Sequence, residues 1–422
     1  MTPQTLNDWL RYQEQIHPKA IELGLERVIR VRDRLGLKPD FPIITVGGTN
    51  GKGSTCAMLE AILHCAGYRV GCYTSPHLLE YNERVRVDAS DASDEMLCEA
   101  FMAVERARGD IALTYFEFGT LAALWIFCRA GLQAAILEVG LGGRLDAVNV
   151  FDADCAIITS VALDHQDYLG DNIEAIGREK AGIFRPNRPA IFSDPDVPQS
   201  VVRHAEASGA RLMVGGRDFG LNRMGGQWQY WGPRRKHHAL PFPALRGVYQ
   251  LRNASGALAA LGELGDVLPL ALQDIKRGLL EVKLPGRLQV LPGRPVVVLD
   301  VAHNPHAATV LADALGDMGL YRKTLAVFSM LRDKDVSGVV AEVKHRVDAW
   351  YIGGVESARA AGVEWLAAQV RTGAPGAPVH PFTRIGAAYR SAWDAVDQDD
   401  RIIVFGSFYT VAEVLRMHQR HS

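Results

Sequence analysis

Residues 45–56, TVGGTNGKGSTC, carry the residue types that bind phosphate groups. In the usual signature, G-x-x-x-x-G-K-[ST], backbone N–H groups and the lysine contact phosphate oxygens, and the hydroxyl holds Mg²⁺. Here Gly51 and Lys52 are followed by Gly53, so the hydroxyl arrives one residue late, as Ser54. Val46 stands where the usual spacing has its first glycine. The segment predicts a phosphate-binding loop whose metal ion takes some of its ligands from elsewhere.

The context of this loop supports the prediction. Residues 42–46 (PIITV) are an apolar, β-branched run typical of a strand, and apolar residues at helical spacing follow over about 54–66. A helix N-terminus offers unpaired N–H groups and a partial positive charge, which favour an anion. The alternative is a plain strand–turn–helix corner with a solvated lysine at position 52.

Further candidates follow other predicted strands. Ser75 lies in TSPHL, Glu138 in LEVGLGG, and Asp164, His165 and Asp167 in SVALDHQDYLG. Because ligands of open α/β sheets bind at the carboxyl ends of the strands, we expect these side chains to lie near the loop and to hold Mg²⁺. Mg²⁺ prefers oxygen ligands and keeps waters, so an imidazole ligand would be unusual. Singly, each residue could instead be a turn residue, a satisfied carboxylate or a packed imidazole.

The elements that must position these residues recur as short apolar runs. They lie at 68–75, 133–139, 154–161 and 188–192. Most are apolar throughout, as expected for strands covered by helices on both faces, so the rhythm predicts a doubly wound, mostly parallel sheet. Residues 210–250 are rich in Gly, Trp, Pro and Arg and predict a β-rich insertion or edge, with a helix over 253–264.

A second α/β domain is expected after a hinge. Proline and glycine cluster over 281–295, and strand-like runs resume at 295–301, 325–330, 348–354 and 401–407. We place the boundary near 285, which gives domains of residues 1–285 and 286–422, and the second fits the usual domain size. The fold class is α/β: an N-terminal P-loop mononucleotide-binding domain and a smaller, Rossmann-like C-terminal domain.

Composition excludes several classes of partner. The chain has 422 residues, a formal net charge of −2 and 22% charged residues, so no basic field predicts binding to nucleic acid or anionic lipid. The basic run RRKHH, residues 234–238, is interpreted as a solvated loop. The longest apolar run, residues 121–128, is far short of the ~20 residues of a membrane-spanning helix.

Targeting and redox signals favour a cytoplasmic protein. The N-terminal residues lack the apolar segment of a secretory signal. All six cysteines lie within the first 155 residues and form no C-x-x-C pair, which indicates buried thiols in a reducing compartment and no zinc site.

With these residues in view, the chain resembles the bacterial bifunctional dihydrofolate synthase/folylpolyglutamate synthases, relatives of the Mur ligases. The resemblance covers nearly the whole chain. Its N-terminal segments are HPKAIELGLERV (17–28), GGTNGKGSTC, YTSPHLLEYNERVRV (73–87), LTYFEFGTLAALW (113–125), LEVGLGGRLDAVN (137–149), SVALDHQDYLG and IGREKAGIFR (176–185). Its C-terminal segments are LPGRLQV, DVAHNPHA (300–307), MLRDKD (330–335) and FGSFYTVAEV (405–414). In this family the late hydroxyl is the normal form of the loop.

The resemblance implies ATP-dependent ligation of L-glutamate to a carboxyl group through an acyl phosphate. The acids would be dihydropteroate, which gives dihydrofolate, and folates, which become polyglutamylated. Residues implied to bind the nucleotide are Thr49, Asn50, Gly51, Lys52, Gly53, Ser54, Asn253, Arg287 and Asp300, so the two domains would close around it. Residues implied to hold Mg²⁺, with two ions expected, are Ser75, Glu138 and His165.

The remaining implied roles concern the acid substrate and catalysis. The pterin acid would be held by Ala20, Ile21, Glu22 and Leu23, by Thr114, Tyr115, Phe116 and Glu117, and by Leu145, Asp146 and Ala147. Lys180 matches a lysine that is carbamylated in the family; without the family, a salt bridge to Glu179 or another acid would be expected. Lys52 would neutralise the transferring phosphoryl group, His303 would orient phosphate or act as a base, and Ser407 would contact glutamate.

Three alternatives stay open. One is folylpolyglutamate synthesis alone. The second is a Mur-type ligase that acts on a UDP-linked precursor; such enzymes carry an extra N-terminal domain, whereas 46 residues precede the loop glycine Gly47 here. The third is a nucleotide-binding switch or scaffold, which does not account for the second α/β domain with Asp300 and His303. We expect a monomer that acts on small molecules.

Overall fold

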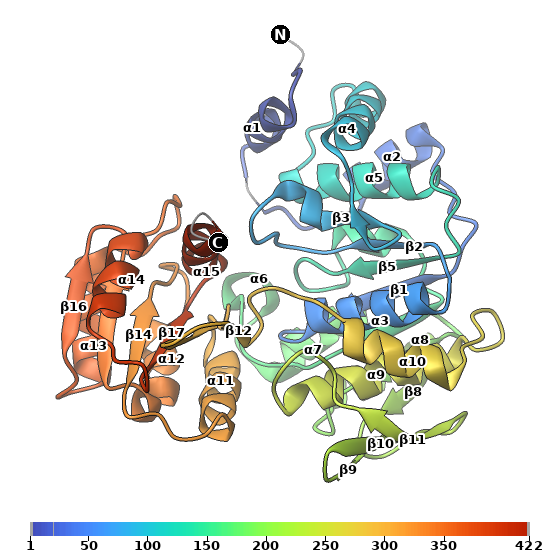
Figure 1. Ribbon diagram of the computed structural model, residues 1–422. Coiled ribbons are helices and arrows are strands. Elements are labelled where there is room, and N and C mark those ends of the chain that lie inside the picture. The colour runs from blue at the N-terminus through green and yellow to red at the C-terminus, as the bar shows by residue number, and fades with distance from the viewer. Residues whose placement is uncertain (1–2, 20, 420–422) are drawn as a thin grey trace. The chain divides into compact units, whose positions relative to one another are not determined.

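The structure, a computed structural model, describes residues 3–19 and 21–419. The chain divides into two compact units (Figure 1), one of residues 1–244 and 250–283 and the other of residues 245–249 and 284–422. Ala20, implied above to contact the acid substrate, lies outside the described residues.

The N-terminal unit is built on an eight-stranded sheet of order β4-β3-β2-β5-β1-β6-β7-β8. The strands are β1 Ile43–Gly47, β2 Val70–Tyr73, β3 Val85–Val87, β4 Ser90–Asp91, β5 Ala134–Glu138, β6 Cys155–Ile158, β7 Pro189–Phe192 and β8 Arg211–Val214. β2–β3 and β3–β4 are antiparallel, and the other pairs are parallel. The mostly parallel sheet predicted from the apolar runs is confirmed.

Helices cover this sheet on both faces (Figure 1), which explains why every residue of β1 and β5 is buried. They are α1 Leu6–Ile16, α2 Glu26–Leu35, α3 Lys52–Cys65, α4 Asp94–Arg108, α5 Tyr115–Phe127, α6 Gln166–Leu169, α7 Ile173–Ala181, α8 Gln199–Ser208, α9 Tyr249–Glu263 and α10 Leu272–Glu281, with 3₁₀ turns η1 Tyr81–Arg84 and η2 Ala147–Val150. Large aromatic side chains, among them Trp9, Phe101 and Phe118, pack in the core of this unit.

The β-rich segment expected within 210–250 is a three-stranded antiparallel sheet of β9 Gly220–Met224, β10 Gln227–Trp231 and β11 Lys236–Pro241. The loop interpretation of residues 234–238 was therefore wrong, because Lys236 to His238 belong to β11. The side chains of Lys236 and His238 are nevertheless exposed, and His237 stacks on Tyr230 with 5.9 Å between ring centroids. An edge strand with solvated charges satisfies the same composition as a loop.

The C-terminal unit has a six-stranded sheet of order β12-β13-β17-β14-β15-β16. Its strands are β12 Gln289–Leu291, β13 Val296–Leu299, β14 Thr324–Phe328, β15 Ala349–Gly353, β16 Val379–Phe382 and β17 Arg401–Phe405. Its helices are α11 Pro305–Asp317, α12 Val336–Val343, α13 Val363–Gly373, α14 Ile385–Asp394 and α15 Phe408–Gln419, with the 3₁₀ turn η3 Lys344–Arg346. Only the edge strand β12, which lies within the Pro/Gly-rich segment 281–295, is antiparallel to its neighbour.

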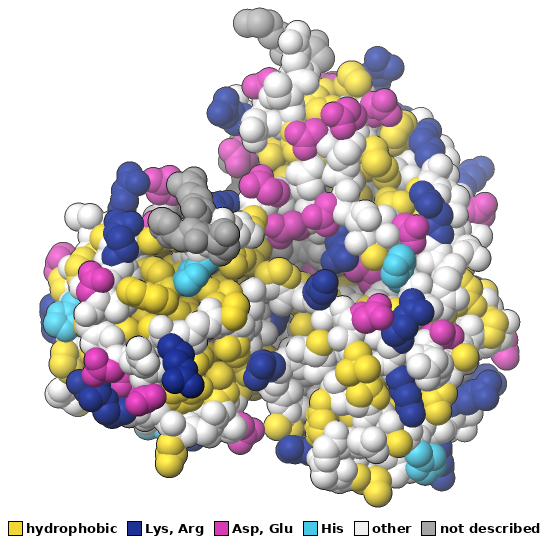
Figure 2. Space-filling model, in the orientation of Figure 1, with side chains coloured by type: hydrophobic (Ala, Val, Ile, Leu, Met, Phe, Trp, Pro, Cys, Tyr) yellow, Lys and Arg dark blue, Asp and Glu magenta, His cyan; other side chains and the backbone are white. Residues whose placement is uncertain are grey.

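The distribution of charge on the surface and the burial of the cysteines are those of an ordinary globular protein. On the face shown in Figure 2, basic and acidic side chains are interspersed over each unit. All six cysteines are free; Cys98 and Cys128 are half-buried and the other four are buried. None of the helices formed by the described residues has the length and apolar character that crossing a membrane requires.

Candidate active site

The loop after β1 runs directly into α3. Gly51 has a φ of 89°, in the left-handed region that favours glycine, and α3 begins at the next residue, Lys52. The predicted helix start at Ser54 was therefore two residues late. No side chain caps this end of α3, so the amide groups of its first turn can face an anion.

The carboxyl end of β6 holds the loop in shape. The N–H of Thr49 donates to the carbonyl oxygen of Ser160 (2.8 Å), and the hydroxyl of Thr49 donates to the carbonyl oxygen of Ala162 (3.2 Å). The Thr159 hydroxyl donates to the carbonyl oxygen of Asn50 at 2.6 Å, and the Asn50 N–H donates to Ser160 Oγ at 3.2 Å. Sequence reasoning missed the roles of Thr159 and Ser160, although both lie at the end of the predicted strand run 154–161.

Helix α9 supports the other side of the loop and brings Asn253, implied above to bind the nucleotide, next to it. A Cβ atom at Gly51 would lie 2.6 Å from Asn253 Oδ1, so the two residues are in close approach. Asn253 Nδ2 donates to Gln250 Oε1 (2.9 Å), and Gln250 Nε2 donates to Ser54 Oγ (3.3 Å). Gln250, one turn before Asn253, was missed; only its position on the same helix face could have indicated it.

Two lysines meet at this loop. Lys52 Nζ donates to the carbonyl oxygens of Gly48 (3.1 Å) and Thr49 (3.2 Å), and Lys180 Nζ from α7 donates to the same Gly48 oxygen at 3.0 Å. Lys180 is only 4% exposed. Burial, reinforced by the positive charge of Lys52, lowers the pKa of Lys180 to about 7. The amine is thus available in its neutral form near neutral pH.

Glu179, the acid considered above as a salt-bridge partner of Lys180, pairs with Arg144 instead. Glu179 accepts from Arg144, with 3.0 Å between Oε1 and Nη2.

Asp146 is buried near the lysines, and burial raises its pKa to about 7, although its Oδ2 and Oδ1 accept the N–H groups of Leu141 (2.9 Å) and Val148 (3.0 Å). A carboxyl group in this state can carry a proton and donate a hydrogen bond to a ligand.

The candidate metal residues Ser75 and Glu138 are brought together. The N–H of Ser75, after β2, donates to Glu138 Oε2, at the end of β5, at 3.0 Å, and Glu138 is 4% exposed. His165 adopts a left-handed φ of 53° at the start of α6, and its Nε2 lies 4.0 Å from Asp164 Oδ1. Within residues 3–19 and 21–419, no group of three or more His, Cys, Asp and Glu is arranged to hold a metal ion.

This donor set fits a hard cation. The buried carboxylate of Glu138 and the hydroxyl of the adjoining Ser75 are oxygen ligands of the kind that Mg²⁺ prefers, and Mg²⁺ completes its shell with waters and substrate phosphates. A site with few protein ligands is therefore what this cation needs, and the absence of a three-carboxylate cluster among the described residues does not conflict with it.

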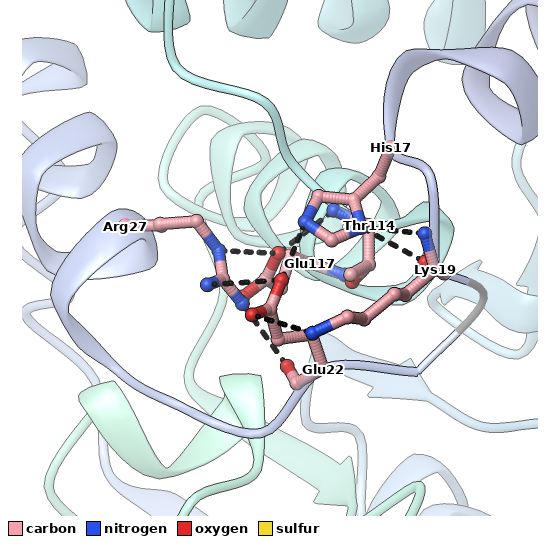
Figure 3. A network of polar contacts seen from close by, with 6 residues as sticks. All are labelled: His17, Lys19, Glu22, Arg27, Thr114 and Glu117. Carbon is pink, nitrogen blue, oxygen red and sulfur yellow. Dashed lines mark hydrogen bonds and ion pairs between the residues drawn. The ribbon is translucent and has the colours of Figure 1, made fainter.

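Several of the residues expected to hold the acid substrate form a polar network (Figure 3). Arg27 Nη2 donates to Glu117 Oε1 (2.9 Å) and to the carbonyl oxygen of Glu22 (3.0 Å). Glu22 Oε2 pairs with His17 Nε2 at 2.7 Å, and Glu117 Oε2 accepts the N–H of Thr114 at 2.7 Å. The network fastens residues 17–27 to the first turn of α5. His17 and Arg27 were missed; Glu117, the partner of Arg27 on α5, lies 90 residues away in the sequence.

The first turn of α5 lies at the carboxyl edge of the sheet. A Cβ atom at Gly140, two residues after Glu138, would lie 2.7 Å from Phe116 Cζ, and Phe116 packs on Tyr73 with 5.8 Å between ring centroids. Four described members of the acid-substrate set are buried, namely Thr114, Glu117, Asp146 and Ala147, and the others are half-buried: Ile21, Glu22, Leu23, Tyr115, Phe116 and Leu145.

In the C-terminal unit, the predicted residues gather around Phe408. The Arg287 guanidinium lies over its ring (4.9 Å), and the His303 ring lies 6.3 Å from it. His303 Nδ1 donates to the carbonyl oxygen of Val301 at 2.8 Å, which leaves Nε2 as the acceptor of the neutral ring. Ser407 precedes Phe408 and is buried.

The side chains of Asp300 and Ser407 form hydrogen bonds within the C-terminal unit. Asp300 Oδ2 and Oδ1 accept the N–H groups of Leu288 and Ala302, both at 2.8 Å, and burial raises its pKa. Ser407 Oγ shares a 2.7 Å hydrogen bond with Thr410 Oγ1 and accepts the N–H of Thr410 at 3.1 Å. Both side chains therefore hold strand ends in place, and their roles toward ligands stay predictions.

Comparison with known protein families shows first which class of enzyme the chain resembles. Residues 46–261 match the Mur ligase middle domain and residues 286–408 match the glutamate ligase domain of Mur ligases. The Escherichia coli dihydrofolate synthase/folylpolyglutamate synthase is 44% identical over 420 residues, which cover 99% of this chain and 97% of that protein.

Solved structures agree. The structure of E. coli FolC in complex with DHPP and ADP is 44% identical, with a TM-score of 0.95 and complete coverage of both chains. A bifunctional folylpolyglutamate synthase/dihydrofolate synthase with Mn, AMPPNP and L-glutamate bound is 46% identical, with a TM-score of 0.91 over 99% of this chain and 100% of that chain. This chain belongs to the dihydrofolate synthase/folylpolyglutamate synthase family of the Mur ligases.

Proposed function

We propose that this chain is an ATP-dependent ligase that joins L-glutamate to dihydropteroate and, by the same chemistry, to folates. The observation that carries the proposal is the convergence of Lys52, Lys180 and Glu138 on one sheet edge, beside an uncapped helix N-terminus, in a chain that aligns end to end with the bifunctional E. coli protein. Residues 1–285 would carry ATP and the acid, and residues 286–422 would form the glutamate-ligase domain.

The chemistry needs activation of a carboxylate, because oxide is not a leaving group. A carboxylate oxygen of the acid attacks the γ-phosphorus of ATP, the bond to the bridging oxygen breaks, and ADP leaves. The amine of glutamate then attacks the acyl carbon, the tetrahedral intermediate expels phosphate, and the amine loses a proton to give the amide. Both steps gather negative charge on phosphoryl oxygens, which Lys52 and the amides of the first turn of α3 can stabilise.

ATP and a divalent cation are the expected cofactors, since relatives have been solved with ADP, and with AMPPNP and Mn. We propose that the cation is Mg²⁺ and that two ions bind, held by Ser75, Glu138 and His165 together with substrate oxygens. These ions would neutralise the charge of the phosphoryl groups. The loop residues Thr49 to Ser54, with Asn253, would bind the phosphates. Arg287 and Asp300 are proposed nucleotide contacts of the C-terminal unit.

Lys180 is proposed to be carbamylated. Its neutral amine would attack CO₂, forming an N–C bond and releasing a proton, which converts a buried cation into a carboxylate. A cation at this position would repel a metal ion, whereas a carbamate could bind one of its waters. The pKa near 7 and the burial of Lys180 support this step.

The acid substrate is proposed to contact the network of Figure 3 and its neighbours, namely Ile21, Glu22, Leu23, Thr114, Tyr115, Phe116, Glu117, Leu145, Asp146 and Ala147. His303 Nε2 is a proposed base for the incoming amine, and Ser407 a proposed glutamate contact. We further propose a cytoplasmic monomer.

The test is phosphate release by the purified protein. Release should require ATP, L-glutamate and either dihydropteroate or tetrahydrofolate. Activity with tetrahydrofolate alone would reduce the proposal to folylpolyglutamate synthesis. Release without any acid or amino acid would favour a nucleotide switch instead.

A further inference from the structure

Arg84, the last residue of η1, differs in its partners from several half-buried or exposed arginines of the N-terminal unit. Ion pairs to carboxylates are made by Arg27, Arg86, Arg144 and Arg185. Arg84 forms no ion pair with any described residue; its Nε donates to His77 Nδ1 at 2.9 Å. It is half-buried. A partly desolvated guanidinium with no counter-ion can bind an anionic ligand at little cost, because no existing pair must be broken.

The guanidinium is also held in place. It lies over the rings of Tyr81, at 5.3 Å from the centroid, and Tyr115, at 5.4 Å. The adjacent Glu83 cannot serve as a flexible counter-ion, because its carboxylate accepts the N–H groups of Leu78, Leu79 and Glu80 at 2.7 to 2.9 Å. With Nε used on His77, the Nη1 and Nη2 groups remain as a fork of the width of a carboxylate.

The position of Arg84 links it to the candidate active site. Its carbonyl oxygen accepts the N–H of Thr74 at 2.9 Å, and the next residue, Ser75, donates its N–H to Glu138. Tyr115, under the guanidinium, is the first residue of α5 and belongs to the expected acid-substrate set. Arg84 therefore lies beside both the candidate metal residues and the residues expected to hold the acid substrate.

The chemistry of the two acids suggests which anion this is. Dihydropteroate has one carboxyl group, and that group reacts. A folate ends in glutamate, whose γ-carboxyl reacts while its α-carboxylate does not. A folate therefore needs a partner for a second negative charge that dihydropteroate does not have.

We propose that Arg84 binds the non-reacting α-carboxylate of the terminal glutamate of a folate acceptor and so serves polyglutamylation rather than dihydrofolate synthesis. This proposal rests on the proposed function. Arg84 would be a specificity-determining residue, and His77 would position it by accepting from Nε.

The experiment compares Arg84→Met and Arg84→Lys with wild type in steady-state phosphate release, with dihydropteroate and with tetrahydrofolate as the acid. Arg84→Met should raise KM for tetrahydrofolate about tenfold or more, since charge-assisted hydrogen bonds of this kind are lost, and should leave KM for dihydropteroate within about twofold. Arg84→Lys keeps the charge but not the fork and should restore only part of the affinity.

Arg129→Met is the matched control, because Arg129 also lies over an aromatic ring, that of Trp125 (3.9 Å), but just beyond the opposite end of α5. It should change neither KM. An equal rise for both acids, or no rise for either, in Arg84→Met would overturn the proposal.

A second measurement separates this proposal from the proposed function. The α-amide analogue of folic acid should bind wild type more weakly than folic acid itself, whereas Arg84→Met should not distinguish the two. If wild type proves inactive with dihydropteroate, the proposed bifunctionality fails, but this binding comparison still decides the role of Arg84. Equal discrimination by wild type and Arg84→Met would reject that role.

Discussion

Lys180 Nζ donates a 3.0 Å hydrogen bond to the carbonyl oxygen of Gly48, which joins α7 to the phosphate loop 132 residues earlier in the chain. The bond places a buried amine beside the ammonium group of Lys52, which donates to the same oxygen. Two like charges in a desolvated site disfavour each other, so the more deeply buried lysine is the one whose proton is easily lost. This relationship makes Lys180 available for carbamylation without any modification being visible in the sequence.

Replacing Lys180 should remove activity that a small acid can restore. Lys180→Ala is expected to lower kcat about a hundredfold or more, because the proposed carbamate, which would organise the metal's waters, could no longer form. Acetate or formate should recover part of the rate by occupying the vacated space. Phosphate release assayed with and without these acids is the measurement.

Arg178→Ala is the control for this experiment, since Arg178 is exposed on the same helix and should tolerate the change. Full activity of Lys180→Ala would remove Lys180 from the mechanism.

The stability of the unmodified protein should depend on pH through Lys180. Its pKa is about 7 in the folded state, against the ordinary lysine value of 10.5, so between these values the unfolded state binds more protons and the free energy of unfolding rises with pH. The contribution is fully present above about 10.5 and is lost as pH falls through 7. The excess stability of Lys180→Met over wild type should therefore shrink by about 1.4 kcal/mol per pH unit from pH 7 upward.

Urea unfolding of both proteins in carbonate-free buffer between pH 7 and 9 measures this difference. Titrating groups that do not interact with Lys180 cancel, because they are shared by the two proteins; Lys52, Asp146 and Asp164 interact with Lys180 and contribute to the difference. A stability difference that does not change over this range would show that Lys180 keeps an ordinary pKa.

The close approach of Gly51 and Asn253 should make Gly51→Ala defective in binding ATP. The new Cβ would stand 2.6 Å from Asn253 Oδ1 at a φ of 89°, so both the loop and α9 must shift away from the phosphates. We expect ATP affinity to fall about a hundredfold, as for other misplaced binding groups, measured by calorimetric titration.

Gly67→Ala is its matched control. Gly67 has a φ of 85°, but nothing lies within 4 Å of its would-be Cβ. This variant should lose about 1 kcal/mol of stability from backbone strain and keep its ATP affinity. Equal ATP affinities of the two variants would mean that the contact with Asn253 does not shape the loop.

Breaking the network of Figure 3 should weaken binding of the acid substrate more than binding of ATP. Arg27→Met leaves Glu117, which is 4% exposed, without its cation, and we expect a loss of about 3 kcal/mol in the free energy of unfolding. Residues 17–27 should detach from α5, so KM for dihydropteroate should rise while KM for ATP stays the same. Denaturant unfolding and steady-state kinetics measure the two effects.

The exposed Arg30 on the same helix provides the control, Arg30→Met, which should match wild type in both measurements. A parallel rise in both KM values for Arg27→Met would point to general loss of structure instead.

Much of the fold could be predicted because burial leaves a local trace in the sequence. The apolar runs at 42–46 and 133–139 became β1 and β5, both buried throughout. The glycine-rich segment 45–56 was predicted to join a strand to a helix, and it joins β1 to α3. The basic run at 234–238 misled us, because composition reports solvation and a solvated edge strand looks like a loop.

The candidate site could be predicted only in part. Ser75, Glu138 and Lys52 follow strands, so the rule that strand ends meet at one edge was enough to group them. Gln250 and Arg27 carry no such signal, because their partners Ser54 and Glu117 lie far away in the sequence.

By itself, the sequence determined which segments are buried strands, where the phosphate loop lies and which family the chain resembles, since each of these is written in the spacing of neighbouring residues. Tertiary structure alone decided that Lys180 meets Gly48, that Arg27 meets Glu117 and that Arg84 meets no acid among the described residues. The physical reason is the strand order: β5 inserts between β2 and β1, so residues 60 or more positions apart become neighbours. No local sequence pattern indicates this strand order.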